Sequence, residues 1–170
     1  VVLIRYSIVF LLFIVLSCSA PPQNLPDDAG LQLIPATGET VLSAIENANA
    51  EVVLVNAWAT WCQPCVEEFP DIMAVHQKYK AQGLKLIFVS ADFENQSEDA
   101  LAFLKSQGVD FPTYLKSGKD MAFINTLDPN WSGVLPATWI YDSKGNKRHF
   151  WQGKTSRAKF EEKIRDVLTN

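Results

Sequence analysis

The sequence predicts an α/β fold in which a mixed central sheet carries helices on both faces. Two runs rich in β-branched residues, 51–57 and 84–90, have the length and continuous hydrophobicity of strands buried on both faces. Stretches with apolar residues at helical spacing follow each run. Near the end of the 170-residue chain, two strands joined by a turn precede a last helix. Strands that alternate with helices and then form a hairpin indicate a mixed sheet.

The first elements follow from local patterns. Residues 31–34 alternate in polarity and stop before a proline, which is typical of a short strand. A helix is expected over 37–50, with Thr37 at its N-cap position. Another helix is expected over 64–80, and Gly83 is positioned to end it.

The second half of the chain continues the alternation. A helix is expected over 97–107, and the stretch 111–132 is expected to hold a short strand and then a short helix over 121–127. The last elements are a hairpin with strands at 137–141 and 147–151, a turn-rich connection at 142–146, and a closing helix over 155–168.

Composition narrows the range of functions. The chain has 15 Lys and Arg against 19 Asp and Glu, a formal net charge of −4. A protein that binds nucleic acid usually carries a basic patch, so we expect no nucleic-acid partner. With 48% hydrophobic and 20% charged residues, the composition is that of an ordinary globular domain.

The N-terminal residues predict export. Arg5 precedes an apolar run that is shorter than a membrane span but suits a signal peptide over residues 1–17. Residues 15–18, Val-Leu-Ser-Cys, resemble the lipobox of bacterial lipoproteins, which implies a lipid anchor on Cys18. The polar, proline-rich stretch 18–30 suits a tether, and the folded domain is expected over 31–170. Ordinary signal cleavage or an uncleaved anchor, with Cys18 incidental, are the alternatives.

Two of the three cysteines form a Cys-x-x-Cys pair, Cys62 and Cys65. A structural disulfide framework would need more and better-spread cysteines. A zinc site would need four ligands, and neither His76 nor His149 has metal-ligand spacing to the pair. We therefore expect no metal and no cofactor, and we interpret both histidines as solvated surface residues.

The position of the pair at the junction of a buried strand and a helix predicts redox chemistry. The thiolate is the nucleophile in disulfide exchange, and unpaired N–H groups at a helix start stabilise negative charge. Cys62 lies at that start, while Cys65 lies one turn deeper. Pro64 falls in the first turn, where a missing N–H costs nothing. Cys62 is therefore predicted to attack and Cys65 to resolve.

Two segments resemble one protein family. Residues 56–70, NAWATWCQPCVEEFP, resemble the active-site segment of the TlpA/ResA branch of thioredoxin-like proteins, and residues 133–139, GVLPATW, resemble its cis-proline loop. The resemblance covers about residues 30–170 and implies a thioredoxin-like fold with thiol–disulfide oxidoreductase activity. It also implies that Pro136 is cis and that the backbone of Leu135 pairs with a substrate peptide.

The proton partner of the pair is expected at Glu68. Ordinary thioredoxins carry Asp six residues before the first Cys, where this chain has Asn56, which cannot exchange a proton. Glu68 follows Cys65 by three residues, on the same helix face, and it matches the acidic residue of the TlpA/ResA branch. We predict that Glu68 helps Cys65 to lose its proton. The alternative is a first-turn acid favoured by the helix dipole, and Glu67 is expected to be a surface charge.

Four tryptophans border these motifs. Trp61 precedes Cys62 and Trp131 precedes the proline loop, so both are candidates for an apolar rim that holds a substrate chain. Packing is the equal alternative for Trp131. Trp58 and Trp139 lie on predicted strands and are expected in the core.

These features together predict an exported thiol–disulfide oxidoreductase that faces the periplasm in the cell envelope. The TlpA/ResA resemblance favours a net reductant of protein disulfides, with cytochrome c maturation as one role in that branch and a membrane electron donor as partner. A net thiol oxidant and a Cu(I) metallochaperone remain alternatives. Thioredoxin-fold peroxidases resemble Pro-x-x-x-Thr-x-x-Cys, but here Val55 and Ala59 occupy the Pro and Thr positions.

Overall fold

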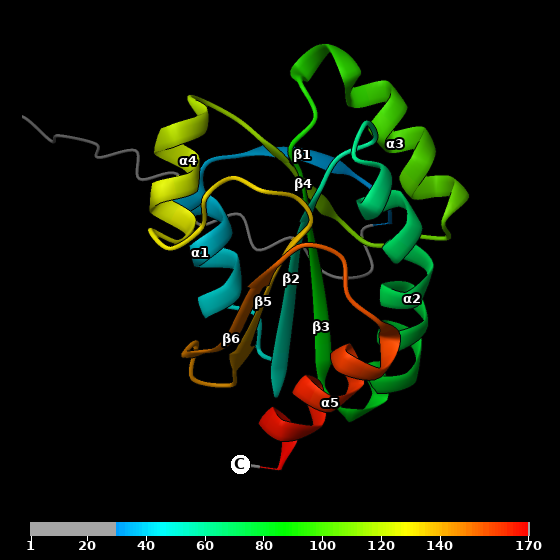
Figure 1. Cartoon of the computed structure of the whole chain (residues 1–170), viewed down its shortest axis with the longest axis vertical. Helices are drawn as coiled ribbons and strands as arrows, with labels where there is room; N and C mark the ends of the chain where they lie inside the picture. The colour runs from blue at the N-terminus through cyan, green and yellow to red at the C-terminus, as the bar shows by residue number, and fades with distance from the viewer. Residues whose placement is uncertain (1–29, 170) are drawn as a thin grey trace, which may run out of the picture.

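The core of the computed structural model, which describes residues 30–169, is one six-stranded sheet (Figure 1). In spatial order the strands are β1 (Leu33–Ala36), β4 (Thr113–Lys116), β3 (Leu84–Ser90), β2 (Val52–Trp58), β5 (Ala137–Asp142) and β6 (Lys147–Gln152). The first four are parallel, whereas β5 is antiparallel to both β2 and β6. The mixed sheet that the sequence predicts is thus confirmed.

Helices cover both faces of this sheet (Figure 1). On one face lie α1 (Gly38–Glu46) and α4 (Asp120–Leu127). On the other lie α2 (Gln63–Tyr79), α3 (Ser97–Ser106) and α5 (Arg157–Leu168), with short 3-10 turns at Lys80–Gln82 and Glu94–Gln96. Among residues 30–169 no helix is both long and apolar enough to cross a membrane.

Strand β2 joins the two hydrophobic layers because all seven of its side chains are buried. Successive side chains of a strand point to opposite faces. Accordingly Leu54 and Trp58 pack beneath α2 and α5, whereas Val53 and Val55 pack beneath α1 and α4. A strand buried on both faces requires the continuous apolar run from which its position was predicted.

The topology brings three loops to one edge of the sheet. Parallel strands β2 and β3 end in register, with Trp58 beside Ser90. Strand β5 begins in the opposite direction at Ala137, which pairs with Ala57. The connections that follow β2 and β3 therefore meet the connection that precedes β5. Open α/β sheets bind ligands beyond the carboxyl ends of their strands.

The observed bounds refine the predicted elements. Thr37 caps α1 by accepting a hydrogen bond from Thr40 N, as predicted, but the helix ends at Glu46 because Asn47 returns its side-chain amide to Ser43 O at 2.8 Å. The stretch 111–132 does contain a short strand and a short helix, β4 and α4. The predicted signal peptide, Cys18 and all but the last residue of the tether lie outside the described residues.

Candidate active site

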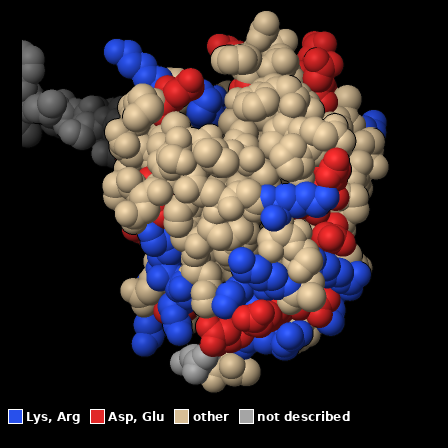
Figure 2. All heavy atoms as spheres, in the orientation of Figure 1, with Lys and Arg blue, Asp and Glu red and all other residues tan. Residues whose placement is uncertain are grey.

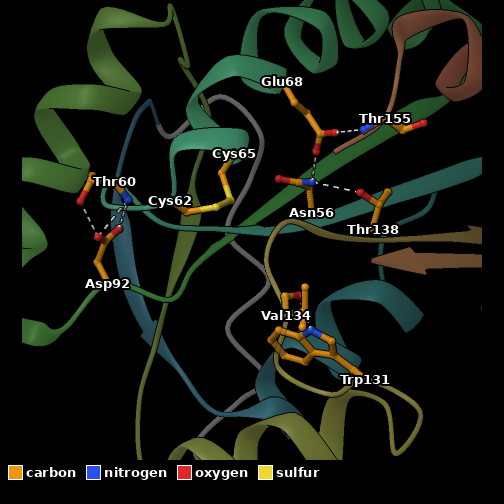
Figure 3. The surroundings of a disulfide bond; sticks show 10 residues. All are labelled: Asn56, Thr60, Cys62, Cys65, Glu68, Asp92, Trp131, Val134, Thr138 and Thr155. Carbon is orange, nitrogen blue, oxygen red and sulfur yellow. Dashed lines mark hydrogen bonds between the residues drawn. A yellow bond between two sulfur atoms is a disulfide. The ribbon is translucent and has the colours of Figure 1, made fainter. Parts of the chain in front are cut away.

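A disulfide between Cys62 and Cys65 lies where β2 gives way to α2 (Figure 3). Cys62 occupies the N-cap position of α2, and its carbonyl accepts hydrogen bonds from the N–H groups of Cys65 and Val66. Pro64 lies in the first turn, where no intrahelical donor is needed. The two Cα atoms are 5.2 Å apart, so one helical turn spans the disulfide.

The position of each cysteine indicates its role in disulfide exchange. Cys62 faces the amino end of a 17-residue helix, where free N–H groups and the helix dipole stabilise a thiolate. Cys65 is 1% exposed and Cys62 6%, so Cys62 is the more accessible of the two residues. This arrangement supports the predicted division, in which Cys62 attacks and Cys65 resolves.

Glu68 lies one turn beyond Cys65 and is fully buried. Its Oε2 accepts a hydrogen bond from Thr155 N at 2.7 Å, and its Oε1 accepts one from Asn56 Nδ2 at 3.3 Å. Asn56 also donates to Thr138 Oγ1 at 3.0 Å (Figure 3). The carboxyl group is thus held between α2, β2 and the loop that leads into α5.

Burial dominates the acidity of this carboxyl. Removal from water raises the pKa of Glu68 from 4.5 to about 7, against the lowering effect of the hydrogen bonds from Thr155 and Asn56 and of the Lys154 charge. A group that titrates near neutral pH can both take and return a proton under physiological conditions. The first turn of α2 contains no acidic residue, and Glu68 lies beyond it. The alternative, in which Glu68 is a first-turn acid favoured by the helix dipole, therefore does not fit.

Glu67, the residue before Glu68, differs from it in exposure, in its partners and in the direction of its pKa shift. It is exposed, pairs with Lys154 Nζ at 2.6 Å, and accepts a hydrogen bond from Gln63 at 3.1 Å. The hydrogen bond from Lys154 lowers the pKa of Glu67 below its ordinary value. The prediction that Glu67 is a surface charge is confirmed.

The proline loop lies next to the strand that leads to the cysteines. The Leu135–Pro136 peptide bond is cis, as the sequence resemblance implied. Leu135 is half-buried and packs against the hydrophobic cluster that includes Cys62 and Cys65. Pro136 O accepts a hydrogen bond from Gly153 N at 2.7 Å. Pairing of the Leu135 backbone with a substrate peptide stays a prediction.

The four tryptophans that border the motifs divide into one exposed residue and three buried ones. Trp61 is 56% exposed beside the disulfide, whereas Trp58 and Trp139 are fully buried, as predicted. Trp131 is also buried, packs edge-to-face on Trp139 with ring centroids 5.2 Å apart, and donates from Nε1 to Val134 O at 2.9 Å. These contacts favour packing for Trp131, and they leave Val134, 53% exposed, at the surface of the proline loop.

Sequence reasoning missed a second polar network, formed by Asp92. Its buried carboxylate accepts hydrogen bonds from Thr60 N and Thr60 Oγ1 (Figure 3). It also accepts one from Ser90 Oγ. In the same view this network and the Glu68 network lie on opposite sides of the disulfide. The available signal was the pair Ser90 and Asp92 at the end of an otherwise apolar strand.

The prediction that both histidines are solvated surface residues is wrong. Both are half-buried instead of solvated: His149 Nε2 lies 2.8 Å from Asp166, and the His76 ring packs edge-on against Phe111. The described part of the chain contains no group of three His, Cys, Asp or Glu side chains that could hold a metal ion.

Comparison with known proteins places this site in context. The model of the AhpC/TSA family matches residues 18–150. The thiol-disulfide oxidoreductase ResA of Bacillus subtilis (strain 168) is 32% identical over 96 residues, 55% of this chain and 48% of that protein. The thioredoxin-like protein YneN of the same organism is 28% identical over 125 residues, covering 72% and 68%. The chain thus matches about half the length of this ResA.

Solved structures are similar in fold. A secreted thiol-disulfide isomerase from Corynebacterium glutamicum has a TM-score of 0.63 at 22% identity, covering 76% of this chain and 75% of that one. A thiol:disulfide interchange protein of the thioredoxin family from Chlorobium tepidum TLS has a TM-score of 0.61 at 22% identity, covering 74% and 83%. These likenesses confirm the thioredoxin-like fold.

Proposed function

The chain belongs to the AhpC/TSA family of thioredoxin-like proteins, and from this premise we propose that it is a thiol–disulfide oxidoreductase whose redox centre is Cys62 and Cys65. The observation that carries the proposal is the disulfide at the amino end of α2, next to a buried carboxyl that titrates near pH 7. The names of the relatives, thiol-disulfide oxidoreductase and thioredoxin-like protein, agree with it.

The reaction begins with the pair reduced. The Cys62 thiolate attacks one sulfur of a substrate disulfide, which forms a mixed disulfide and releases the other substrate sulfur as a thiolate. Cys65 then loses its proton and attacks the Cys62 sulfur, which releases the second substrate thiol. The substrate disulfide gains two electrons, and the pair is left as the Cys62–Cys65 disulfide seen in the structure. An external thiol donor must reduce this disulfide before the next cycle.

Glu68 is the proton acceptor for the second step. Cys65 is buried, so its thiol needs a nearby base in place of water, and Glu68 lies three residues further along α2. With a pKa of about 7, this carboxyl is partly ionised at neutral pH and can take the Cys65 proton. Asn56 and Thr155 fix its orientation by hydrogen bonds.

Substrate binding is assigned to the uncharged surface around the disulfide. Exposed Trp61, which precedes Cys62, and exposed Val134, in the proline loop, offer apolar contact, and the backbone of Leu135 offers hydrogen bonds to an extended chain. Figure 2 shows that the centre of the face drawn there consists almost entirely of uncharged residues, whereas charged side chains gather toward the end that carries α5. An unfolded polypeptide with a disulfide is the substrate that suits such a surface.

A net reductant outside the cytoplasm is the physiological role that we propose. Support comes from the signal-like residues 1–17, from relatives whose printed names include a secreted thiol-disulfide isomerase, and from the TlpA/ResA-like motifs. Lipid on Cys18 and the tether over 18–30 would hold the domain at the membrane, where a membrane electron donor could reduce it. Reduction of apocytochrome c disulfides is the candidate task.

The test is catalysis of insulin-disulfide reduction by dithiothreitol. We expect the protein to accelerate the reaction, Cys62→Ser and Cys65→Ser to abolish the acceleration, and the exposed control Met121→Ala to retain it. Tight Cu(I) binding with little insulin reduction would instead support a metallochaperone. The reduction potential against glutathione decides direction: about −270 mV indicates a reductant and about −120 mV an oxidant.

A further inference from the structure

A tight turn connects the end of β2 to the cysteine pair. Cys62 N donates to Ala59 O at 3.2 Å, which closes a β-turn with Thr60 and Trp61 at its centre. The turn therefore determines where Cys62 meets the helix start and in which direction the exposed Trp61 side chain points. Its own closing hydrogen bond uses neither the N–H nor the hydroxyl of Thr60.

Asp92 accepts both of these Thr60 donors. Thr60 N lies 3.0 Å from Oδ1 and 3.2 Å from Oδ2, and Thr60 Oγ1 lies 2.5 Å from Oδ1. Ser90 Oγ donates to Oδ2 at 2.7 Å, and Asp92 N donates back to Ser90 Oγ at 3.0 Å. The residue is fully buried, so a carboxylate there needs all of these donors in place of water.

A backbone hydrogen bond reinforces the same connection. Ala91 N donates to Trp58 O at 2.7 Å, so the chain that leaves β3 is fastened to the chain that leaves β2 at two successive points. Polar groups that hold a turn from a neighbouring strand keep the reacting atom in place, and a displacement of about 1 Å at a reacting group can cost about 100-fold in rate.

We propose that Asp92 is a positioning residue for disulfide exchange, which holds the 59–62 turn through Thr60 and thereby keeps Cys62 at the amino end of α2. The inference rests on the proposed function and extends it to a residue in the loop that follows β3. Asp92 acts through geometry: its role is to accept from Thr60, and it does not touch the reacting sulfur atoms.

The experiment measures the reactivity of the Cys62 thiol alone, in the full chain with Cys18→Ser and Cys65→Ser. Two quantities are measured, the rate of Cys62 alkylation by iodoacetamide at pH 7 and the pKa of its thiol from thiolate absorbance. Asp92→Ala should lower the alkylation rate at least tenfold, because Cys62 leaves the helix start. Asp92→Asn keeps an oxygen acceptor toward Thr60 and should stay within threefold. The exposed carboxylate Glu94 supplies the control, Glu94→Gln.

Two results would overturn the proposal. One is an Asp92→Ala protein with the unsubstituted alkylation rate and thiol pKa. The other is an equal change in Asp92→Ala and Asp92→Asn, which would assign the effect to charge instead of geometry. If Asp92→Ala does not fold, Thr60→Val and Thr60→Ser replace it: Val should lower the rate at least threefold and Ser should restore it, and equal rates contradict the proposal.

These readouts need no protein substrate. A chain that fails to reduce insulin would refute the proposed oxidoreductase function, yet its Cys62 alkylation would still test Asp92. Conversely, an active protein that is indifferent to Asp92→Ala would refute only the positioning role.

Discussion

Replacement of Glu68 by Gln should change how the stability of the oxidised protein depends on pH. The carboxyl is fully buried, and burial raises its pKa from 4.5 to about 7. The folded state therefore binds this proton more tightly than the unfolded state does. The contribution to stability is fully present below pH 4.5, declines as pH rises, and is lost above about pH 7.

The size of the effect follows from the displacement of the pKa. Moving a pKa from 4.5 to about 7, at 1.36 kcal/mol for each pH unit, corresponds to about 3 kcal/mol in the free energy of unfolding. Glutamine cannot ionise, so Glu68→Gln should remove this decline between pH 4.5 and 7. The variant loses a hydrogen bond acceptor toward Asn56 or Thr155, a cost of about 1 kcal/mol that does not depend on pH.

Urea unfolding at several pH values, without reductant, measures the effect. The disulfide keeps both cysteines from titrating, so the difference between the two proteins isolates Glu68. Glu67→Gln is the matched control: the hydrogen bond from Lys154 lowers the pKa of exposed Glu67, the opposite direction from Glu68, so this variant should keep the decline. Parallel stability profiles for the unsubstituted protein and Glu68→Gln would show that the buried Glu68 carboxyl does not have a raised pKa.

Two further predictions concern one exposed and one buried side chain, Trp61 and Asp128. Trp61→Ala should raise KM for a protein disulfide severalfold and leave urea stability within about 0.5 kcal/mol, because the side chain is exposed; an unchanged KM would exclude Trp61 from the binding surface. Asp128→Ala should destabilise the protein by about 2 kcal/mol, because it leaves Nε1 of buried Trp139, now 2.9 Å from Asp128 Oδ2, without its acceptor. Urea unfolding checks this value, and a loss below 1 kcal/mol would contradict it.

The sequence was sufficient to locate an element where one physical signal dominates the segment. Buried strands need continuous apolar runs, and so β2 and β3 were located to within one residue. The pair Cys62 and Cys65 was recognisable because a strand, a helix start and the proline loop each left a separate pattern. Helix ends were less certain, since Asn47 ends α1 through a side-chain hydrogen bond that hydrophobic spacing does not encode.

Contacts between distant segments could not be predicted in the same way. Glu68 is sealed by Thr155, 87 residues away, and Thr60 is held by Asp92, 32 residues away. Trp131 precedes the proline loop in a position equally suited to substrate contact or to packing, and only its partner Trp139 favours packing. The environment of each of these residues depends on a contact with a distant segment, which hydrophobic spacing and local motifs do not encode.

A mixed-disulfide trap distinguishes the attacking cysteine, Cys62, from the resolving cysteine, Cys65. The reduced chain with Cys18→Ser and Cys65→Ser is mixed with a peptide disulfide, quenched in acid and digested for mass spectrometry. We expect a stable peptide adduct on Cys62. In the matched chain with Cys18→Ser and Cys62→Ser, Cys65 should stay largely unmodified, because it is buried. Equal adducts on Cys65 in that chain, or none on Cys62 in the first, would contradict the account.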